Sequence, residues 1–452
     1  MSSRPARSCS ILFAALLAAR SVCGQAEVPT IFQFSLSNPG ARSLGLGGAF
    51  VALADDATAA FANPAGLVQL ARPEVSVEGR LWSYSTPFTE AGRISGQPTG
   101  VLLDVSPATR TGVSSELVTG LSFISFTYPK EDWSVAVYRH ESANFEAAAE
   151  TQGFFAAPPL PDDDIVTLSF QVDDTLRLPD LRRITDLEIV TYGFSGAFRP
   201  TESFSVGGGV SYFDGSLRST VDIFAAVDET LPQGPFGGNA YREAARAFTA
   251  DSTVDDSDWG FNGGFLWHLS DRWNVGGSYR EGPRFDLSNL EISGPALEPF
   301  VPEGTVTLKS TTRIGFPDVF SLGVVYQPEG GATTVSFEWD RVQHSNLFEG
   351  EPESLELGLR LDDVNELHLG FEYVFINATP TVALRFGAWT DPDHRIRYVG
   401  DDPVLRALFP AGDDEVHFAV GFGMAFSKFQ IDVGVDLSDL VNTTSFSAIY
   451  SF

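Results

Sequence analysis

Lysine is almost absent from this chain, and cysteine is confined to its beginning. The 452 residues include only three lysines, Lys130, Lys309 and Lys428, and 59 acidic residues outweigh 29 basic ones, giving a formal net charge of −30. Nucleic acid is bound by clustered Lys and Arg, so this balance argues against it as a partner. The two cysteines, Cys9 and Cys23, both precede residue 27. A mature chain that began there would have neither disulfides nor thiolate chemistry.

Long apolar runs are also missing. No stretch after the first residues reaches the about 18 consecutive apolar residues that indicate a transmembrane helix. The N-terminus instead has the layout of an export signal, with a basic start, an apolar run at 11–19, and small residues at Gly24 and Ala26. Residues 1–26 are therefore predicted to be a cleaved signal peptide. An exported chain without a helical span can still cross a membrane as a closed β-barrel.

Catalytic and nucleotide-binding motifs are absent as well. The chain has no G-x-S-x-G, no G-x-x-x-x-G-K-[ST] and no H-E-x-x-H sequence, and its 6 histidines are scattered. We therefore expect no enzyme activity, no cofactor and no metal site. The acidic runs 162–164 and 251–258 suit a divalent cation near lipopolysaccharide, but solvated loop charge is the interpretation that we favour.

What the chain does contain is a repeated alternation of apolar and polar residues. From Val416 to Phe426 every second residue is apolar, and the residues between them are small or polar. This is the pattern of a strand with two different faces. It recurs at 190–198, 204–212, 259–268, 366–375 and 431–438. A soluble β-sandwich produces the same alternation, so the strands alone do not separate the two architectures.

The connections favour a membrane barrel. Short connections alternate along the chain with long ones, and the long ones are 85–114, 144–183, 215–252, 286–304, 346–362, 392–413 and a shorter one at 439–442. Short turns at one end and long loops at the other are typical of outer-membrane barrels. Seven outer connections with six turns between them predict fourteen strands. Their expected bounds are 74–84, 115–128, 131–143, 184–199, 202–214, 253–269, 272–285, 305–327, 332–345, 363–376, 380–391, 414–427, 428–438 and 443–452.

The chain ends on an aromatic residue. Phe446, Ala448, Tyr450 and Phe452 fall on one face of the last predicted strand. Outer-membrane barrels commonly end in this way, and the barrel-assembly machinery reads such a terminus. Tyr450 and Phe452 are therefore the predicted assembly signal.

Charged residues occupy the face opposite the apolar one on several predicted strands. In a barrel whose apolar face meets lipid, that opposite face lines the lumen. The predicted lumen-lining residues are Glu338, Glu366, His368, Glu372 and Arg385. A polar lumen accounts for them without catalysis.

Residues 40–67 differ from everything that follows. They are rich in Gly and Ala, lack alternation and hold one basic residue, Arg42. Their apolar surface is too small to fold alone, so we expect the barrel to contain them as a plug. The cluster of Gly45, Gly47 and Gly48 is interpreted as backbone freedom for a tightly folded segment.

Several stretches resemble the FadL/TodX-type outer-membrane transporters for long-chain fatty acids and other hydrophobic compounds. Residues 43–67 read SLGLGGAFVALADDATAAFANPAGL, and residues 315–345 read GFPDVFSLGVVYQPEGGATTVSFEWDRVQHS, with Phe316 where Leu is more usual. Segments 381–393 and 417–428 also match, whereas residues 85–310 contribute little.

The resemblance implies an all-β, fourteen-stranded antiparallel transmembrane barrel plugged by an N-terminal hatch. The implied organisation is a signal peptide at 1–26, a hatch at 27–73 and the outer-membrane barrel at 74–452. Ligand would be captured near the outer loops, enter an apolar lumen pocket and leave sideways through a gap in the wall. The residues expected to form or gate the hatch are Gly45, Gly47, Gly48, Asp55, Asp56, Asn63, Pro64 and Ala65. Pro64 disfavours helix at Asn63 and fixes a turn there.

The leading functional hypothesis is hatch-gated, passive uptake of long-chain fatty acids or other hydrophobic small molecules across a Gram-negative-type outer membrane. The expected partners are that ligand, outer-membrane lipid and lipopolysaccharide, and the barrel-assembly machinery. The alternative is a porV-like barrel that acts as a protein-interaction scaffold for secretion, towards which the acidic inward positions lean slightly. A general aqueous pore is disfavoured, because an open channel has no use for a folded segment in its lumen.

Overall fold

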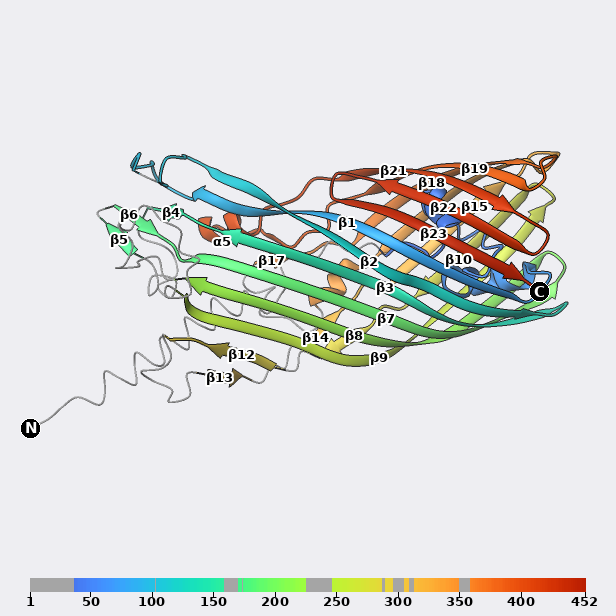
Figure 1. Ribbon diagram of the computed structural model, residues 1–452, viewed down its shortest axis with the longest axis horizontal. Coiled ribbons are helices and arrows are strands. Elements are labelled where there is room, and N and C mark those ends of the chain that lie inside the picture. The colour runs from blue at the N-terminus through green and yellow to red at the C-terminus, as the bar shows by residue number, and fades with distance from the viewer. Residues whose placement is uncertain are drawn as a thin grey trace, which may run out of the picture.

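The computed structural model of the chain describes residues 36–101, 103–157, 170–172, 174–224, 246–286, 289–295, 305–308, 313–348 and 358–452. Most of these residues belong to one sheet that curls round and closes into a barrel (Figure 1). The first and last strands close it by antiparallel pairing, from Glu74 opposite Ser451 to Tyr84 opposite Val441.

Nineteen strands share this sheet, and fourteen of them form the barrel wall. The wall strands are β1 (Glu74–Arg93), β2 (Thr109–Pro129), β3 (Trp133–Thr151), β7 (Asp180–Thr201), β8 (Phe204–Phe224), β9 (Arg246–Ser270), β10 (Trp273–Arg280), β15 (Val319–Tyr326), β16 (Thr333–Val342), β18 (Val364–Phe375), β19 (Thr381–Asp391), β21 (Glu415–Ala425), β22 (Phe429–Leu437) and β23 (Val441–Ser451). Each pairs antiparallel with its neighbours in chain order. The predicted fourteen-stranded antiparallel barrel is confirmed.

The remaining elements are short. Five strands extend the sheet at the long-loop end: β4 (Phe154–Ala156), β5 (Phe170–Val172), β6 (Thr175–Arg177), β12 (Asn289–Ser293) and β13 (Thr305–Leu308). Two small pairs are separate, β11 (Arg284–Asp286) with β14 (Arg313–Gly315) and β17 (Leu359–Arg360) with β20 (Arg397–Tyr398). The helices within the described residues are α2 (Ala41–Gly45), α3 (Ala59–Ala62), α5 (Pro403–Leu408) and the 3-10 helices η1 (Pro64–Gln69) and η5 (His344–Phe348). Among the described residues, no helix has the length and apolar character needed to cross a membrane.

The alternation of the sequence becomes the two faces of the wall. In β21, Phe418, Val420 and Phe422 point outward and are exposed, while His417 and Ala419 point inward and are buried. The inward residues are buried by the groups that fill the lumen, so the polar face of the wall is the closely packed face. An apolar outer surface of this kind is what lipid meets in a transmembrane barrel.

On one half of the barrel the wall strands are longer than expected. The first six wall strands contain 19 to 25 residues, whereas the other eight contain 8 to 12. Much of the expected loops 85–114, 144–183 and 215–252 is therefore strand. The prediction was wrong there because these extensions reach beyond the apolar band, so the apolar face that marked each strand is lost while its ladder continues.

Two strands on the opposite half are shorter than expected. The predicted strand 305–327 is wrong, since the wall strand begins only at Val319 and the residues before it form β13 and β14. The predicted strand 272–285 ends at Arg280. Prolines explain both corrections. Pro317 and Pro283 have no N–H to donate, so neither can continue a central ladder.

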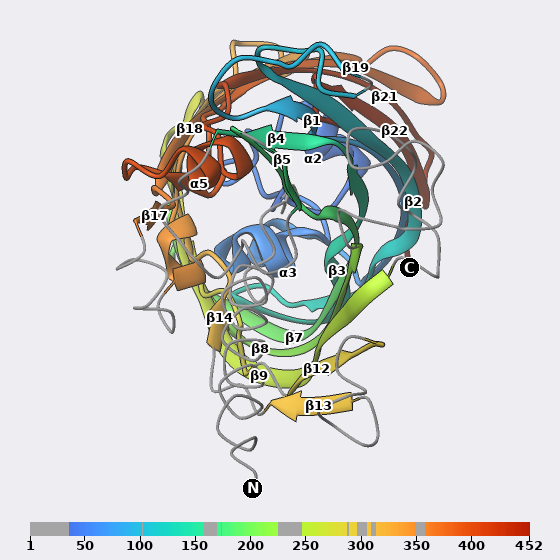
Figure 2. The same ribbon diagram turned by 90° about the vertical axis from the view of Figure 1, so that its left-hand side faces the viewer.

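The N-terminal hatch fills the lumen near the end of the barrel that carries the short turns. Figure 2 looks along the barrel from the other end and has α2 and α3 inside the ring of strands. Leu46, Phe50 and Leu67 of the hatch are fully buried and belong to one apolar cluster with Phe123 and Tyr138 of the wall. The barrel thus supplies the apolar contacts that residues 40–67 lack by themselves.

Glycine permits the hatch to lie directly on the wall. Gly47 has a φ of 62° and meets Gly387 of β19 so closely that a Cβ on Gly387 would lie 2.2 Å from the Gly47 nitrogen. Gly45 meets Gly421 of β21 in the same way, with a Cβ–Cα separation of 2.8 Å. No side chain fits between two backbones at this distance, so glycine is required on both sides.

We expect Gly387→Ala to lower the free energy of unfolding by about 1–3 kcal/mol, the usual cost of overpacking a close contact. The control is Gly79→Ala in β1, where an added Cβ meets only the Gly120 carbonyl oxygen, at 3.7 Å. Urea titration of the detergent-solubilised barrel, followed by its heat-modifiable gel shift, measures both. Equal stabilities of the two variants would contradict the close hatch–wall contact.

Candidate ligand pathway through the barrel

A chain of buried ion pairs fixes the hatch to the wall. Arg42 of α2 lies between Asp55 of the hatch and Glu372 of β18, with its Nη2 atom 3.1 Å from Glu372 Oε1. Arg385 of β19 contacts the same Glu372 at 2.6 Å and Asp432 of β22 at 2.7 Å. Since each carboxylate has at least one guanidinium partner, the network spans three wall strands without an isolated charge.

Carboxylates of the wall also hold the hatch backbone. Glu338 of β16 accepts hydrogen bonds from the N–H groups of Phe50 and Val51, at 2.6 and 2.7 Å. Glu78 of β1 accepts the N–H of Gly40 at 2.9 Å. The hatch has little regular structure, so these side chains replace the ladder or helix partners that its backbone would otherwise need.

The Asn63–Pro64 turn is tied to both the hatch and the wall. The Asn63 side chain donates to the carbonyl groups of Val51 (2.8 Å) and Phe265 (3.0 Å). Its oxygen accepts the N–H of Ala65 at 3.2 Å, which caps η1, and Pro64 occupies the first position of that helix. This is the arrangement that N-cap Asn and N1 Pro favour.

Above the hatch the lumen is divided into two chambers by Arg280. This residue ends β10, and its guanidinium donates to the Asn38 side chain and to the Leu36 carbonyl oxygen. Leu36 and Arg280 line both chambers. The guanidinium also lies 4.8 Å from the ring centre of Phe61 in the hatch. One buried cation therefore stands at the boundary between the two spaces.

The first space, here called the apolar chamber, has about 630 Å³ of empty volume, part of which is open to solvent. Its lining includes Phe61, Tyr138, Ile189, Phe213, Phe316 and Val319. Two polar groups in its wall are already partnered: the Tyr138 hydroxyl contacts Ser211 Oγ at 3.2 Å, and the His140 ring contacts the Ser122 carbonyl at 3.0 Å. The buried Oδ1 of Asn262, which also lines the chamber, has no hydrogen-bond partner in the described structure. The surface left for a ligand is thus largely aromatic and aliphatic.

The apolar chamber reaches the wall at an interruption of the sheet. The β9–β10 ladder ends at Asn262 opposite Arg280, and Glu281, Gly282 and Pro283 then turn away into β11. Beyond this point, Asp258 and Asp256 of β9 accept the N–H groups of Arg284 and Asp286, at 2.8 and 2.9 Å. One backbone hydrogen bond, from the Glu281 N–H to the Phe261 carbonyl oxygen at 3.0 Å, still crosses the break. Beyond it, side chains close the wall instead of a backbone ladder. Phe261, Glu281, Gly282 and Pro283 line the chamber at this wall break.

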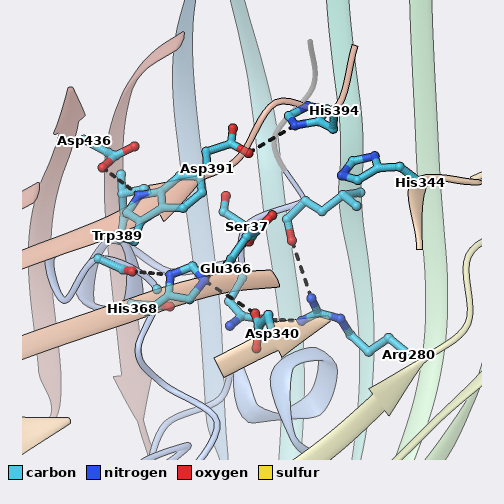
Figure 3. Close-up of a pocket in the computed structure, with 16 residues that line it drawn as sticks. Ser37, Arg280, Asp340, His344, Glu366, His368, Trp389, Asp391, His394 and Asp436 are labelled. Carbon is cyan, nitrogen blue, oxygen red and sulfur yellow. Dashed lines mark hydrogen bonds and ion pairs between the residues drawn. The ribbon is translucent and has the colours of Figure 1, made fainter. Parts of the chain in front are cut away.

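The second space, here called the polar chamber, has about 660 Å³ of empty volume, part of which is open to solvent, and Arg280 is among its lining residues (Figure 3). Its lining includes Asp340, Glu366, His368, Trp389, Asp391 and His394. Trp389 stacks on His368 with ring centres 5.2 Å apart and on His417 at 3.8 Å. A space lined by so many carboxylates disfavours an apolar ligand.

Two histidines close the polar chamber at the rim, outside the wall strands. The ring of His394 stacks on that of His344 at 4.3 Å, and its Nδ1 lies 3.1 Å from Asp391. Burial opposes the charged form of His394, but the Asp391 carboxylate outweighs it and raises the pKa of His394 to about 9. Burial and the neighbouring His394 hold the pKa of His344 well below its usual value. One ring is therefore charged and its partner neutral near pH 7.

Comparison with known proteins identifies the family. The family model described as "Outer membrane protein transport protein (OMPP1/FadL/TodX)" matches residues 171–440, more than half of the chain. The chain belongs to the FadL/TodX family. It is an outer-membrane β-barrel transport protein for hydrophobic compounds. A sequence search among curated proteins found no match.

Solved structures share the fold of this FadL/TodX-family barrel. A FadL homologue of Pseudomonas aeruginosa is 13% identical, with a TM-score of 0.60, and covers 94% of this chain and 99% of its own. The toluene transporter TbuX of Ralstonia pickettii is 14% identical, with a TM-score of 0.53 and coverage of 92% and 99%. The monoaromatic hydrocarbon channel CymD is 16% identical, with a TM-score of 0.55 and coverage of 93% and 99%. The matching family model describes transport proteins, so the scaffold alternative gains no support.

The lumen residues expected from the sequence all point inward but have three different surroundings. Glu338 holds the hatch backbone, Glu372 and Arg385 belong to the ion-pair chain, and Glu366 and His368 line the polar chamber. Sequence reasoning missed the residues of the apolar chamber and its boundary, above all Phe61, Tyr138, His140 and Arg280. The prolines at 283 and 317 were the available signal, because they mark the wall break.

The expected hatch residues also make different kinds of contact. Asp55 joins the ion-pair chain, whereas Asp56 caps its own turn by accepting the N–H of Thr58 at 2.9 Å. Ala65 lies against β8, where Ser205 donates to its carbonyl at 2.9 Å. At the end of the chain, Tyr450 and Phe452 are exposed on the outer face of the barrel with ring centres 5.1 Å apart.

We expect Glu372→Gln to lower the free energy of unfolding by about 3 kcal/mol, because it removes the carboxylate shared by two buried guanidinium groups. The matched control is Glu90→Gln, which removes a solvent-exposed partner of Arg110 and changes stability by about 1 kcal/mol at most. Urea titration followed by tryptophan fluorescence measures both. Similar losses in the two variants would show that the buried chain does not anchor the hatch.

Proposed function

We propose that this FadL/TodX-family barrel takes up long-chain fatty acids or similar apolar small molecules by passive diffusion through the apolar chamber. The observation that carries the proposal is the course of that chamber, which extends from Phe61 of the hatch to the wall break at Glu281–Pro283. Its aromatic and aliphatic lining suits an apolar ligand, which gains free energy by leaving water. The relatives named for toluene and monoaromatic hydrocarbons support an apolar cargo.

Arg280 favours a cargo with an acidic head group. A guanidinium has five N–H donors and binds carboxylates in a forked geometry. Arg280 lies at the edge of the apolar chamber and is almost fully buried. A fatty acid whose chain occupied the chamber would have its carboxylate within the same space as this cation. A neutral hydrocarbon would leave it unused.

Release takes place sideways, through the wall break. An apolar ligand that left towards the aqueous side would have to be solvated again, whereas one that left between β9 and β10 would enter lipid directly. Phe261 supports this route, because it lines the chamber although its side chain is about half exposed on the outside of the barrel.

The hatch, residues 27–73, controls this passage. Leu36 and Asn38 hold Arg280 through the contacts described above. A ligand carboxylate would compete with them for the guanidinium, which loosens the start of the described hatch. The residues proposed to keep the rest of the hatch in place are Gly45, Gly47, Gly48, Asp55, Asp56, Asn63, Pro64 and Ala65.

Export and assembly complete the proposal. Residues 1–26 act as a cleaved signal peptide, and Tyr450 and Phe452 form the signal that the barrel-assembly machinery reads. Lipid and lipopolysaccharide surround the apolar outer face.

A disulfide across the wall break tests the lateral route. A Cβ at Gly260 would lie 3.5 Å from the Cβ of Glu281, within the about 3.5–4.5 Å that a disulfide needs. We expect oxidised Gly260→Cys/Glu281→Cys protein to reduce uptake of radiolabelled oleate to the level of cells without the barrel. A reducing agent should restore uptake.

The control places a disulfide between strands that are already paired. Gly112→Cys with Glu90→Cys joins β2 to β1, where the two Cβ atoms would be 3.1 Å apart and would have to separate by about 0.4 Å to reach the range of a disulfide. It should leave uptake unchanged in both redox states. Unchanged uptake in the oxidised Gly260→Cys/Glu281→Cys protein would overturn the lateral route.

Arg280→Gln tests the chemical class of the cargo. We expect it to weaken oleate binding by about 1.5–3 kcal/mol, the usual value of a hydrogen bond to a charged group. Binding of oleyl alcohol, which has the same chain without the charge, should not change. Quenching of tryptophan fluorescence in detergent measures both ligands, with the exposed Arg110→Gln as the control variant. Equal weakening of acid and alcohol would mean that Arg280 only maintains the chamber.

A further inference from the structure

Three potential metal ligands converge on the inner face of two neighbouring strands. Asp340 of β16 lies directly opposite Glu366 of β18, and His368 is the next inward residue on β18. One ligand atom from each of these residues lies within 4.8 Å of the others. All three border the polar chamber, as Figure 3 shows.

The hatch determines which nitrogen of His368 faces the two carboxylates. Nδ1 of the ring lies 2.8 Å from the carbonyl oxygen of Gly47, so this nitrogen carries the proton and donates it. In a neutral ring, Nε2 then presents its lone pair towards Glu366 Oε2 at 3.4 Å and Asp340 Oδ2 at 3.7 Å. Metal-bound histidines typically have this arrangement, with the other ring nitrogen donating to a backbone carbonyl or carboxylate.

Two of these buried groups have atoms without a hydrogen-bond partner. His368 Nε2 and Asp340 Oδ1 make no hydrogen bond in the described structure, although the residues are only 6% and 7% exposed. The separations from Nε2 exceed the about 2.7–2.9 Å of a charge-assisted hydrogen bond. Unsatisfied buried groups of this kind carry a large desolvation penalty. A cation between the three residues would remove it.

The surrounding charge also favours a cation. Glu338, Asp340 and Glu366 are neighbours across β16 and β18, and Arg280 is the guanidinium that interacts with all three. Its own hydrogen bonds go to Asn38 and Leu36. A divalent cation would place further positive charge beside Asp340 and Glu366 and would favour the ionised form of both carboxyl groups.

We propose that Asp340, Glu366 and His368 bind a divalent first-row transition-metal cation such as Zn²⁺. Bonds of about 2.0–2.1 Å in tetrahedral geometry separate neighbouring ligand atoms by about 3.3–3.4 Å. The distances of 3.4 and 3.7 Å from Nε2 are close to that spacing, and the ligand atoms of the two carboxylates lie within 4.8 Å of each other. The imidazole selects against Mg²⁺ and Ca²⁺, which prefer sites made of oxygen. The fourth position opens on the polar chamber, where water completes the coordination.

The metal site would also stiffen the hatch. His368 reaches Gly47 through its second nitrogen, and the neighbouring Glu338 holds Phe50 and Val51. Fixing the His368 ring from the metal side therefore fixes the hatch loop around residues 47–51. The metal and the proposed cargo occupy different chambers, so either proposal can fail without the other.

The test uses the purified full-length barrel in detergent, stripped with a chelator and titrated with Zn²⁺ by calorimetry. We expect one ion per chain, and we expect Asp340→Asn and His368→Gln each to weaken binding at least tenfold. His140→Gln is the matched control. His140 is equally buried and also bonds a backbone carbonyl, that of Ser122, but no carboxylate lies within ion-pair distance of it in the described structure. This variant should bind as the parent does.

Three outcomes would overturn the proposal. The first is that no Zn²⁺ binds, which would mean that His368 is a charged ring paired with both carboxylates. The second is that binding survives Asp340→Asn and His368→Gln, which would place the ion elsewhere. The third is that His140→Gln weakens binding as much as the two site variants do. If His368→Gln does not fold, Glu366→Gln and the absorption spectrum of Co²⁺ bound to the parent protein replace it. A tetrahedral Co²⁺ spectrum that Glu366→Gln abolishes supports the site, and an octahedral aqueous spectrum contradicts it.

Discussion

The structure depends on providing hydrogen-bond partners for the backbone of an irregular segment, the hatch, inside a closed sheet. A barrel wall uses most of its backbone hydrogen bonds between strands, so it has few to offer to the hatch, such as the Phe265 carbonyl that accepts from Asn63. Side chains take over: Glu338 receives the N–H groups of Phe50 and Val51, Glu78 that of Gly40, and Ser195 donates to the Ala60 carbonyl at 2.7 Å. The lumen face of the wall is therefore polar because its residues must bind backbone, and the contacts of Gly45 and Gly47 need glycine because the two backbones touch.

The side chains that hold the hatch differ between the two halves of the lumen. Where β16, β18, β19 and β22 meet the hatch, carboxylates and guanidinium groups fill the space, and the polar chamber continues that chemistry upward. Where β3, β7 and β8 face the hatch, aromatic and aliphatic residues take over and the apolar chamber runs to the wall break. Arg280 separates the halves. One barrel can thus offer an apolar route for cargo and a separate charged cluster that holds the hatch.

Sequence reasoning worked where the signal is local. The alternation around Val416–Phe426 located β21, and the Asn63–Pro64 pair located a turn that the structure realises as the capped start of η1. It failed where the pattern depends on what surrounds the strand. The long extensions of the first six wall strands lose the outward apolar face because they leave the apolar band, while inward residues such as Leu217 and Val221 of β8 remain apolar and buried. The predicted strand 305–327 ignored Pro317, which has no N–H for the ladder.

The sequence by itself determined the strand periodicity and the inward position of Glu366 and His368, because both follow from the two-residue repeat of a strand. It also determined the count of fourteen strands, because long and short connections alternate along the chain. Tertiary structure alone decided which inward residues meet. Asp340 faces Glu366 only through the register of β16 on β18, and His368 has its tautomer fixed only by Gly47, some 321 residues earlier. Arg280 and Phe61 come together only when the hatch lies in the closed barrel. Contacts over such separations depend on closure of the sheet, which no local pattern encodes.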